Sequence, residues 1–174
     1  MIGLAFAVFF AAAVMPASAV DVKIATVAQK GLPVVQLRVV VPGGKAADGP
    51  KPGLAALTAS LLKDGGAGSM SSRDLVTRVE SMGAELSVET GFDASTFGLA
   101  VTKDRLAEAL DLLGAVVARP RLEEVELKKL GARTAERLSD LARTSGAWGA
   151  QMVLHRDLFA LPSEHHPYAT FSPT

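Results

Sequence analysis

The order in which hydrophobic periods follow one another constrains the fold of this 174-residue chain most strongly. Apolar and polar residues alternate in short segments, which is typical of strands, while other segments carry apolar residues three or four positions apart, which is typical of helices. We expect strands over residues 22–27, 32–41, 85–89 and 96–101, and helices over residues 52–62, 71–82, 104–117, 123–143 and 146–159. This order predicts an α+β fold, a mainly antiparallel sheet with helices packed on one face.

Local signals set the ends of these elements. Residues 32–41 are rich in β-branched side chains, so we expect a more deeply buried strand there than over the half-buried 22–27. Ser71 and Asp74 have the spacing of a capping box, and Gly83 is a natural helix stop. The segment Gly91-Phe92-Asp93 joins two alternating segments and predicts an antiparallel hairpin.

The composition excludes several classes of function. Eighteen basic residues balance eighteen acidic ones, so no excess charge indicates binding to nucleic acid or electrostatic docking on a membrane. The absence of cysteine excludes disulfides and thiolate metal sites. Aromatic residues make up only 5% of the chain, so its core must consist mostly of Leu, Val and Ala.

The first 19 residues are almost wholly apolar and end in Ala17-Ser18-Ala19, an A-x-A cleavage signal behind an apolar run. We expect a cleaved signal peptide over residues 1–19, an exported (periplasmic or secreted) mature chain, and no membrane attachment after cleavage. An uncleaved anchor is the alternative, because no Lys or Arg precedes Lys23 to form the usual basic start of a signal. Pro16 shortens the apolar run below the length that normally spans a bilayer.

The helix expected over residues 52–62 reads Pro-Gly-Leu-Ala-Ala-Leu-Thr-Ala-Ser-Leu-Leu and is followed by the turn Gly65-Gly66. Its leucines form an apolar stripe at helical spacing. Taken alone, it could be an ordinary amphipathic helix.

In outline, however, this helix resembles the metal helix of the pitrilysin/insulinase zinc peptidases, which reads G-L-A-H-x-x-E-H-x-L before a Gly turn. The Gly, Leu and Ala positions of this pattern and its Gly turn are present, but Ala56, Ala59 and Ser60 stand where the family has His, Glu and His. Such a motif holds zinc with its two imidazoles, while its carboxylate takes a proton from the metal-bound water. Neither alanine nor serine supplies these groups.

Further motifs follow in the family's order, and together they extend the resemblance over residues 22–174. They are Ser81-Met82-Gly83-Ala84, the helix 106–113 of the type L-x-x-A-L-x-L-L, the turn and helix start over 120–126, and His166-Pro167-Tyr168. The resemblance implies that residues 20–174 form the N-terminal lobe of such a peptidase, incomplete at its C-terminal end.

Active relatives use zinc, but this chain departs from their motif. We therefore expect a function without turnover, with no catalytic residue, no metal ligand and no zinc cofactor. In two-chain relatives such as mitochondrial processing peptidase, one subunit carries zinc and the other helps to enclose the peptide. We expect this chain to be such a non-catalytic member, with a homologous zinc-bearing subunit as its partner and a peptide or unfolded protein as the enclosed substrate. Two alternatives remain open: a stand-alone module that binds peptides at a sheet edge, and a truncated, inactive relic.

Two other sets of residues have the right chemistry for metal binding. Glu136 lies 76 positions after Ser60, where the resemblance implies a third zinc ligand, so it is either a relic of that ligand or part of a charged, solvated helix face. The three histidines are His155, His165 and His166, with Glu164 beside the last two. Consecutive side chains diverge, and His155 shares an apolar stripe with Phe159, so packing is the expected role of His155.

Overall fold

The computed structural model describes residues 22–28 and 31–159. The chain divides into two units, residues 1–32 and 33–174. In the first unit, residues 22–28 are exposed and form no strand. The strand expected over 22–27 is therefore wrong. Alternation produces a strand only where a neighbouring strand accepts its backbone hydrogen bonds, and the sheet of the described chain contains no such neighbour for this segment.

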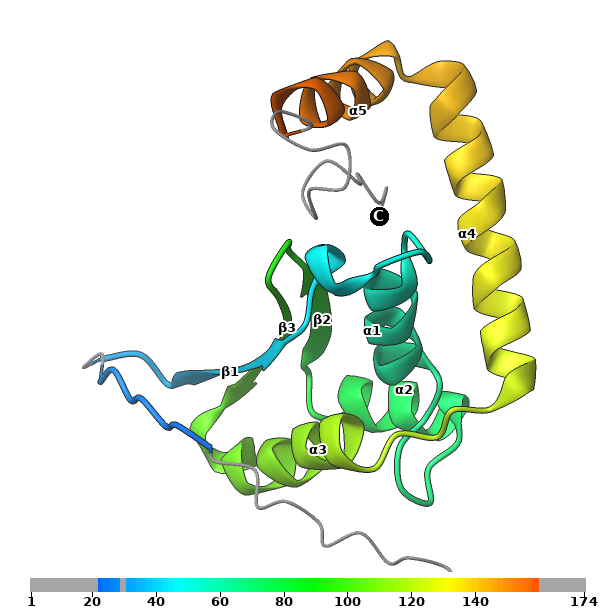
Figure 1. Cartoon of the computed structure of the whole chain (residues 1–174). Coiled ribbons are helices and arrows are strands. Elements are labelled where there is room, and N and C mark those ends of the chain that lie inside the picture. The colour runs from blue at the N-terminus through cyan, green and yellow to red at the C-terminus, as the bar shows by residue number, and fades with distance from the viewer. Residues whose placement is uncertain (1–21, 29–30, 160–174) are drawn as a thin grey trace, which may run out of the picture. The chain divides into compact units, whose positions relative to one another are not determined.

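The second unit contains a three-stranded antiparallel sheet (Figure 1). Its strands are β1 (Val34–Pro42), β2 (Glu85–Thr90) and β3 (Ala94–Thr102), in the order β1-β3-β2. Leu99 of the central strand pairs with Leu37 of β1 and Leu86 of β2. The hairpin expected around Gly91-Phe92-Asp93 is confirmed as β2 and β3.

The burial of β1 differs from the expectation. Its residues alternate between exposed and half-buried, and none is fully buried. Val40 is 62% exposed although it is β-branched. The expectation of a deeply buried strand was wrong because β1 lies at the edge of the described sheet, where helices cover one face only. Composition alone does not distinguish an edge strand from a central one.

Five helices follow the expected ranges to within two residues at the start of each. They are α1 (Leu54–Asp64), α2 (Ser72–Ser81), α3 (Leu106–Ala118), α4 (Glu124–Thr144) and α5 (Gly146–Phe159), with short 3-10 turns at Lys45–Ala47 and Lys103–Arg105. The α+β class with an antiparallel sheet is confirmed. The described residues include no helix long and apolar enough to cross a bilayer.

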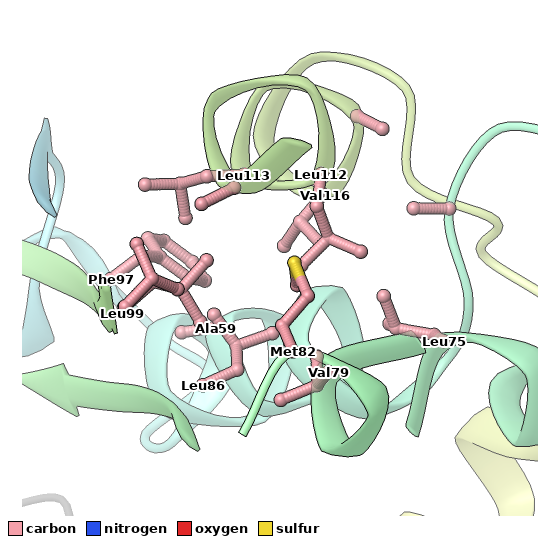
Figure 2. Packing of buried hydrophobic residues seen from close by; sticks show 14 residues of the cluster. Ala59, Leu75, Val79, Met82, Leu86, Phe97, Leu99, Leu112, Leu113 and Val116 are labelled. Atoms are coloured by element: carbon pink, nitrogen blue, oxygen red, sulfur yellow. The ribbon is translucent and has the colours of Figure 1, made fainter. Parts of the chain in front are cut away.

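One hydrophobic core joins the sheet to α1, α2 and α3 (Figure 2). Phe97 and Leu99 of β3 are each 2% exposed, and Val116 of α3 is fully buried. Most of the other buried residues are Leu, Val or Ala, as the low aromatic content predicts. By contrast, neither α4 nor α5 has a fully buried side chain, so both helices lie outside this core.

The capping box at the start of α2 is confirmed. The Asp74 N–H donates to the Ser71 hydroxyl, and the Asp74 carboxylate accepts from the Ser71 N–H and hydroxyl. These hydrogen bonds lower the pKa of Asp74 below its ordinary 3.8. The bond from the Ser71 hydroxyl has the larger effect, and the bond from the Ser71 N–H adds to it. The carboxylate therefore contributes stability above the unfolded-state pKa, and this contribution is lost as pH falls through the lower folded-state pKa.

Replacing Asp74 by asparagine is expected to lower Tm at neutral pH. The difference between variant and wild type should shrink as pH falls from 3.8 through the lower folded-state pKa, because the wild-type carboxylate becomes protonated first in the unfolded and then in the folded chain. Thermal melts followed by circular dichroism across this pH range measure both effects. Asp111→Asn, on the exposed face of α3, is the matched control and should show neither effect. A difference independent of pH would contradict the ionic role of the cap.

Gly44 brings the loop after β1 against the β2–β3 turn. The N–H groups of Gly43, Lys45 and Ala46 donate to the carbonyls of Asp93, Gly91 and Phe92, each at 2.9 Å. A Cβ atom at Gly44 would collide with the backbone oxygens of Gly91 and Phe92.

Gly44→Ala is therefore expected to lower the free energy of unfolding by about 2 kcal/mol, as overpacking does. Urea unfolding measures this change. The control is Gly114→Ala in the middle of α3, where a Cβ meets nothing within 4 Å. That change should stabilise the protein by about 0.5–1 kcal/mol. Equal effects at both positions would exclude the steric explanation.

Several expectations fall outside the described residues: the signal peptide over 1–19, the cluster of Glu164, His165 and His166, and the motif His166-Pro167-Tyr168.

Candidate functional site

A cavity of about 690 Å³ lies between α1, the edge strand β2 and α4. From α1 and the loop before it, the lining residues are Lys45, Lys51, Pro52, Gly53, Leu54, Ala56, Leu57 and Ser60. Strand β2 adds Val88, Glu89 and Thr90, and α4 adds Gly131, Thr134, Ala135, Arg137 and Leu138. In Figure 1, α4 runs alongside α1, which agrees with their contacts.

Asp48 fixes the start of α1 at one end of this cavity. Its side chain is almost fully buried, at 4% exposure. One carboxylate oxygen accepts from the Gly53 N–H and the other from the Ala55 N–H, both at 2.7 Å. The residue at the helix N-cap, Gly53, has no side chain to accept these bonds and adopts a φ of 92°. Asp48 therefore performs the capping role from five residues upstream. This role was not predictable from the sequence, because Asp48 lies outside the usual capping position.

The three positions that replace the family's zinc motif have two different environments. Ala56 and Ser60 both line the cavity, because four residues place them on the same face of α1. Ala59 is 4% exposed and belongs to the hydrophobic core (Figure 2). The cavity wall thus presents a methyl group and a hydroxyl at the two positions where the family has histidines. The third position, Ala59, faces the core and not the cavity.

Glu136 is not brought into the cavity. It lies on α4 and is exposed, and it is absent from the cavity lining. Thr134, Ala135 and Leu138 form the face of α4 that lines the cavity. Glu136 follows Thr134 by two positions and so lies about 200° further around the helix. The structure therefore does not bring Glu136 together with Ala56 and Ser60.

The cavity is lined instead by charged residues that no sequence motif marks. Lys45, Lys51 and Arg137 contribute positive charges, and Glu89 contributes one negative charge. Burial lowers the pKa of the Lys45 ammonium, while the nearby Asp48 carboxylate opposes this shift. In sequence, these cations look like ordinary surface charges, because Lys45 and Arg137 are 92 positions apart.

The residues of the cavity do not suit zinc. Protein zinc sites use Cys, His, Asp or Glu as ligands, usually three or four of them, and a serine hydroxyl is not among the usual ones. Of these residue types, the cavity lining contains only Glu89. Nowhere among residues 22–28 and 31–159 do three His, Asp or Glu side chains come together in a group that could hold a metal ion.

His155 packs against aromatic rings, as its apolar stripe predicts. Its ring centroid lies 5.3 Å from that of Phe92 and 5.7 Å from that of Phe159, where the rings are stacked. These contacts join α5 to the turn between β2 and β3. A role in packing accounts for His155.

The sequence profile of the family Insulinase (Peptidase family M16) matches residues 23–167. The chain belongs to the insulinase family. The suspected resemblance is therefore confirmed at the level of the family, and the match spans both α1 and α4, whose facing residues line the cavity.

A solved structure gives the same fold. The chain is similar to the crystal structure of a peptidase M16 inactive domain from Pseudomonas fluorescens, with a TM-score of 0.70 and 24% sequence identity. The match covers 82% of this chain and 34% of that one, so this insulinase-family chain spans about a third of its neighbour's length. No curated protein matches the chain.

Proposed function

We propose that this chain is a non-catalytic member of the insulinase family that helps a zinc-bearing subunit to enclose a peptide. The observation that carries the proposal is the cavity wall at Ala56 and Ser60, which offers neither imidazole nor carboxylate. Peptide hydrolysis by this family's chemistry needs a metal-bound water and a base beside it. The residues that line this cavity cannot hold that metal ion, because Glu89 is the only one of them that belongs to the usual zinc-ligand types.

The cavity retains features suited to holding a peptide. Its volume of about 690 Å³ lies within the usual range of binding sites. One wall is β2, which pairs only with β3 among the described strands, and Val88, Glu89 and Thr90 of this strand line the cavity. Edge strands can hydrogen-bond an extended peptide. The similarity to a structure described as an inactive domain also supports the proposal.

The test combines the full chain with a zinc-bearing insulinase-family subunit from the same genome. A quenched-fluorescent peptide library reports cleavage. We expect no cleavage by this chain alone and at least a tenfold rise in kcat/KM when it joins the zinc-bearing subunit, since enclosure improves substrate positioning. Complex formation is measured in parallel by analytical ultracentrifugation. Cleavage by this chain alone would overturn the non-catalytic assignment, and failure to associate would overturn the partner role.

One edge of β2 is covered by no other described strand, which favours a second candidate, a stand-alone peptide-binding module. The two functions differ in one readout. A stand-alone module binds the peptide library with the same affinity in the presence and absence of a zinc-bearing subunit. A chain that only helps to enclose the peptide binds the library peptides measurably only in the complex, or binds them more tightly there. Fluorescence anisotropy of labelled library peptides, with and without that subunit, distinguishes them.

A further inference from the structure

The cavity carries a local excess of positive charge in a chain whose formal net charge is zero. Lys45, Lys51 and Arg137 are the cationic residues of its lining and Glu89 is the acidic one. With the Asp48 carboxylate near Lys45 also counted, three positive and two negative charges leave one positive charge. The remaining lining residues are uncharged. A concave surface with one sign of charge attracts ligands of the opposite sign.

Two of these cations have no ion pair within the described chain. Six other cations on the helices or beside them pair with neighbouring carboxylates, including Lys128, Lys129 and Arg143 on α4 itself. Neither Lys51 nor Arg137 takes part in any salt bridge between residues 22–28 and 31–159. Both therefore have the capacity to pair with a carboxylate that enters the cavity.

The Asp48 carboxylate beside the start of α1 is already engaged. Asp48 accepts both of its short hydrogen bonds from the backbone at the start of α1. It consequently offsets the positive end of that helix, and no ion pair joins it to Lys51 or Arg137 within residues 22–28 and 31–159. The charges of Lys51 and Arg137 remain available to a ligand.

We propose that the cavity binds an acidic side chain of an extended peptide, with Lys51 and Arg137 as its ionic partners and β2 as the strand beside which the peptide lies. This inference rests on the proposed function and specifies its substrate class. The carboxylate occupies the space left open by the small side chains of Ala56 and Ser60. Arg137 approaches it from α4 and Lys51 from the loop before α1, so the acidic residue is held between two elements.

The test uses the full chain and two labelled decapeptides that differ only in a central Glu or Gln. Fluorescence anisotropy is measured with the chain alone and with the zinc-bearing subunit. We expect the Glu peptide to bind about tenfold more tightly, because its carboxylate can form charge-assisted hydrogen bonds that the Gln amide cannot. The difference in affinity should shrink at high salt, since salt screens these charges. The double variant Lys51→Gln/Arg137→Gln should bind both peptides equally. Arg133→Gln, also exposed on α4 but outside the lining, should keep the preference.

The outcomes separate the two proposals. Equal binding of the Glu and Gln peptides by the wild-type chain would overturn the charge inference and leave peptide enclosure standing. A preference that survives in the double variant would also overturn it, because the carboxylate would then bind elsewhere. No binding of either peptide, with or without the zinc-bearing subunit, would overturn the proposed function and this inference with it. Circular dichroism confirms that each variant is folded.

Discussion

Replacing Phe97 by alanine is expected to lower the free energy of unfolding by about 4 kcal/mol, the largest effect of any single truncation in this domain. Phe97 is 2% exposed at the centre of β3, and its ring packs within the cluster formed by the sheet, α1, α2 and α3 (Figure 2). Phe97 is the only aromatic residue in the buried core of the described residues, so no second core ring can fill the space. The loss therefore combines the transfer of a large apolar side chain with an open cavity.

Val40→Ala is the matched control for Phe97→Ala. Val40 lies on the adjacent strand β1, opposite Thr96, and is 62% exposed on the face that helices leave uncovered. Its truncation should change the free energy of unfolding by about 0.5 kcal/mol or less, as surface substitutions do. Urea unfolding of both variants gives the comparison. If Val40→Ala were the more damaging change, the assignment of the covered face of the sheet would be wrong.

Replacing Asp48 by alanine is expected to lower the free energy of unfolding by about 3 kcal/mol. The change removes two charge-assisted hydrogen bonds of 2.7 Å and leaves the Gly53 and Ala55 N–H groups without their acceptor. The start of α1, which forms one wall of the cavity, should loosen with it. Hydrogen exchange at the amides of residues 53–56 is expected to accelerate more than exchange in α3.

Asp64→Ala separates this capping role from a general loss of negative charge. Asp64 lies at the other end of the same helix, where it is exposed and forms a salt bridge of 3.7 Å with Lys63. A negative charge at a helix C-terminus is unfavourable, so this variant should be neutral or slightly more stable. Similar losses in both variants would show that the cap at Asp48 contributes little.

Local signals in the sequence were sufficient for most of the fold. The capping box of Ser71 and Asp74 was predictable because both partners lie three residues apart and their geometry depends on nothing else. The β2–β3 hairpin was equally predictable from the Gly-Phe-Asp turn between two alternating segments. The same alternation failed over residues 22–27, because a strand needs a partner that the segment itself cannot specify.

The site was only partly predictable. Ala56 and Ser60 were identified by their place in the motif, and the structure brings both to the cavity. The exposure of Glu136 was not predictable, since the rotation of α4 about its axis depends on how that helix packs against α1. Lys51 and Arg137 were missed for a related reason: cations 86 positions apart carry no local sign that they line one cavity.

Metal analysis of the purified chain shows directly whether this insulinase-family chain uses zinc, which we propose it does not. The chain is incubated with zinc, dialysed against metal-free buffer and measured by inductively coupled plasma mass spectrometry. We expect far less than one zinc ion per chain, with no change in Glu136→Gln. One tightly held zinc ion per chain that Glu136→Gln releases would contradict the account.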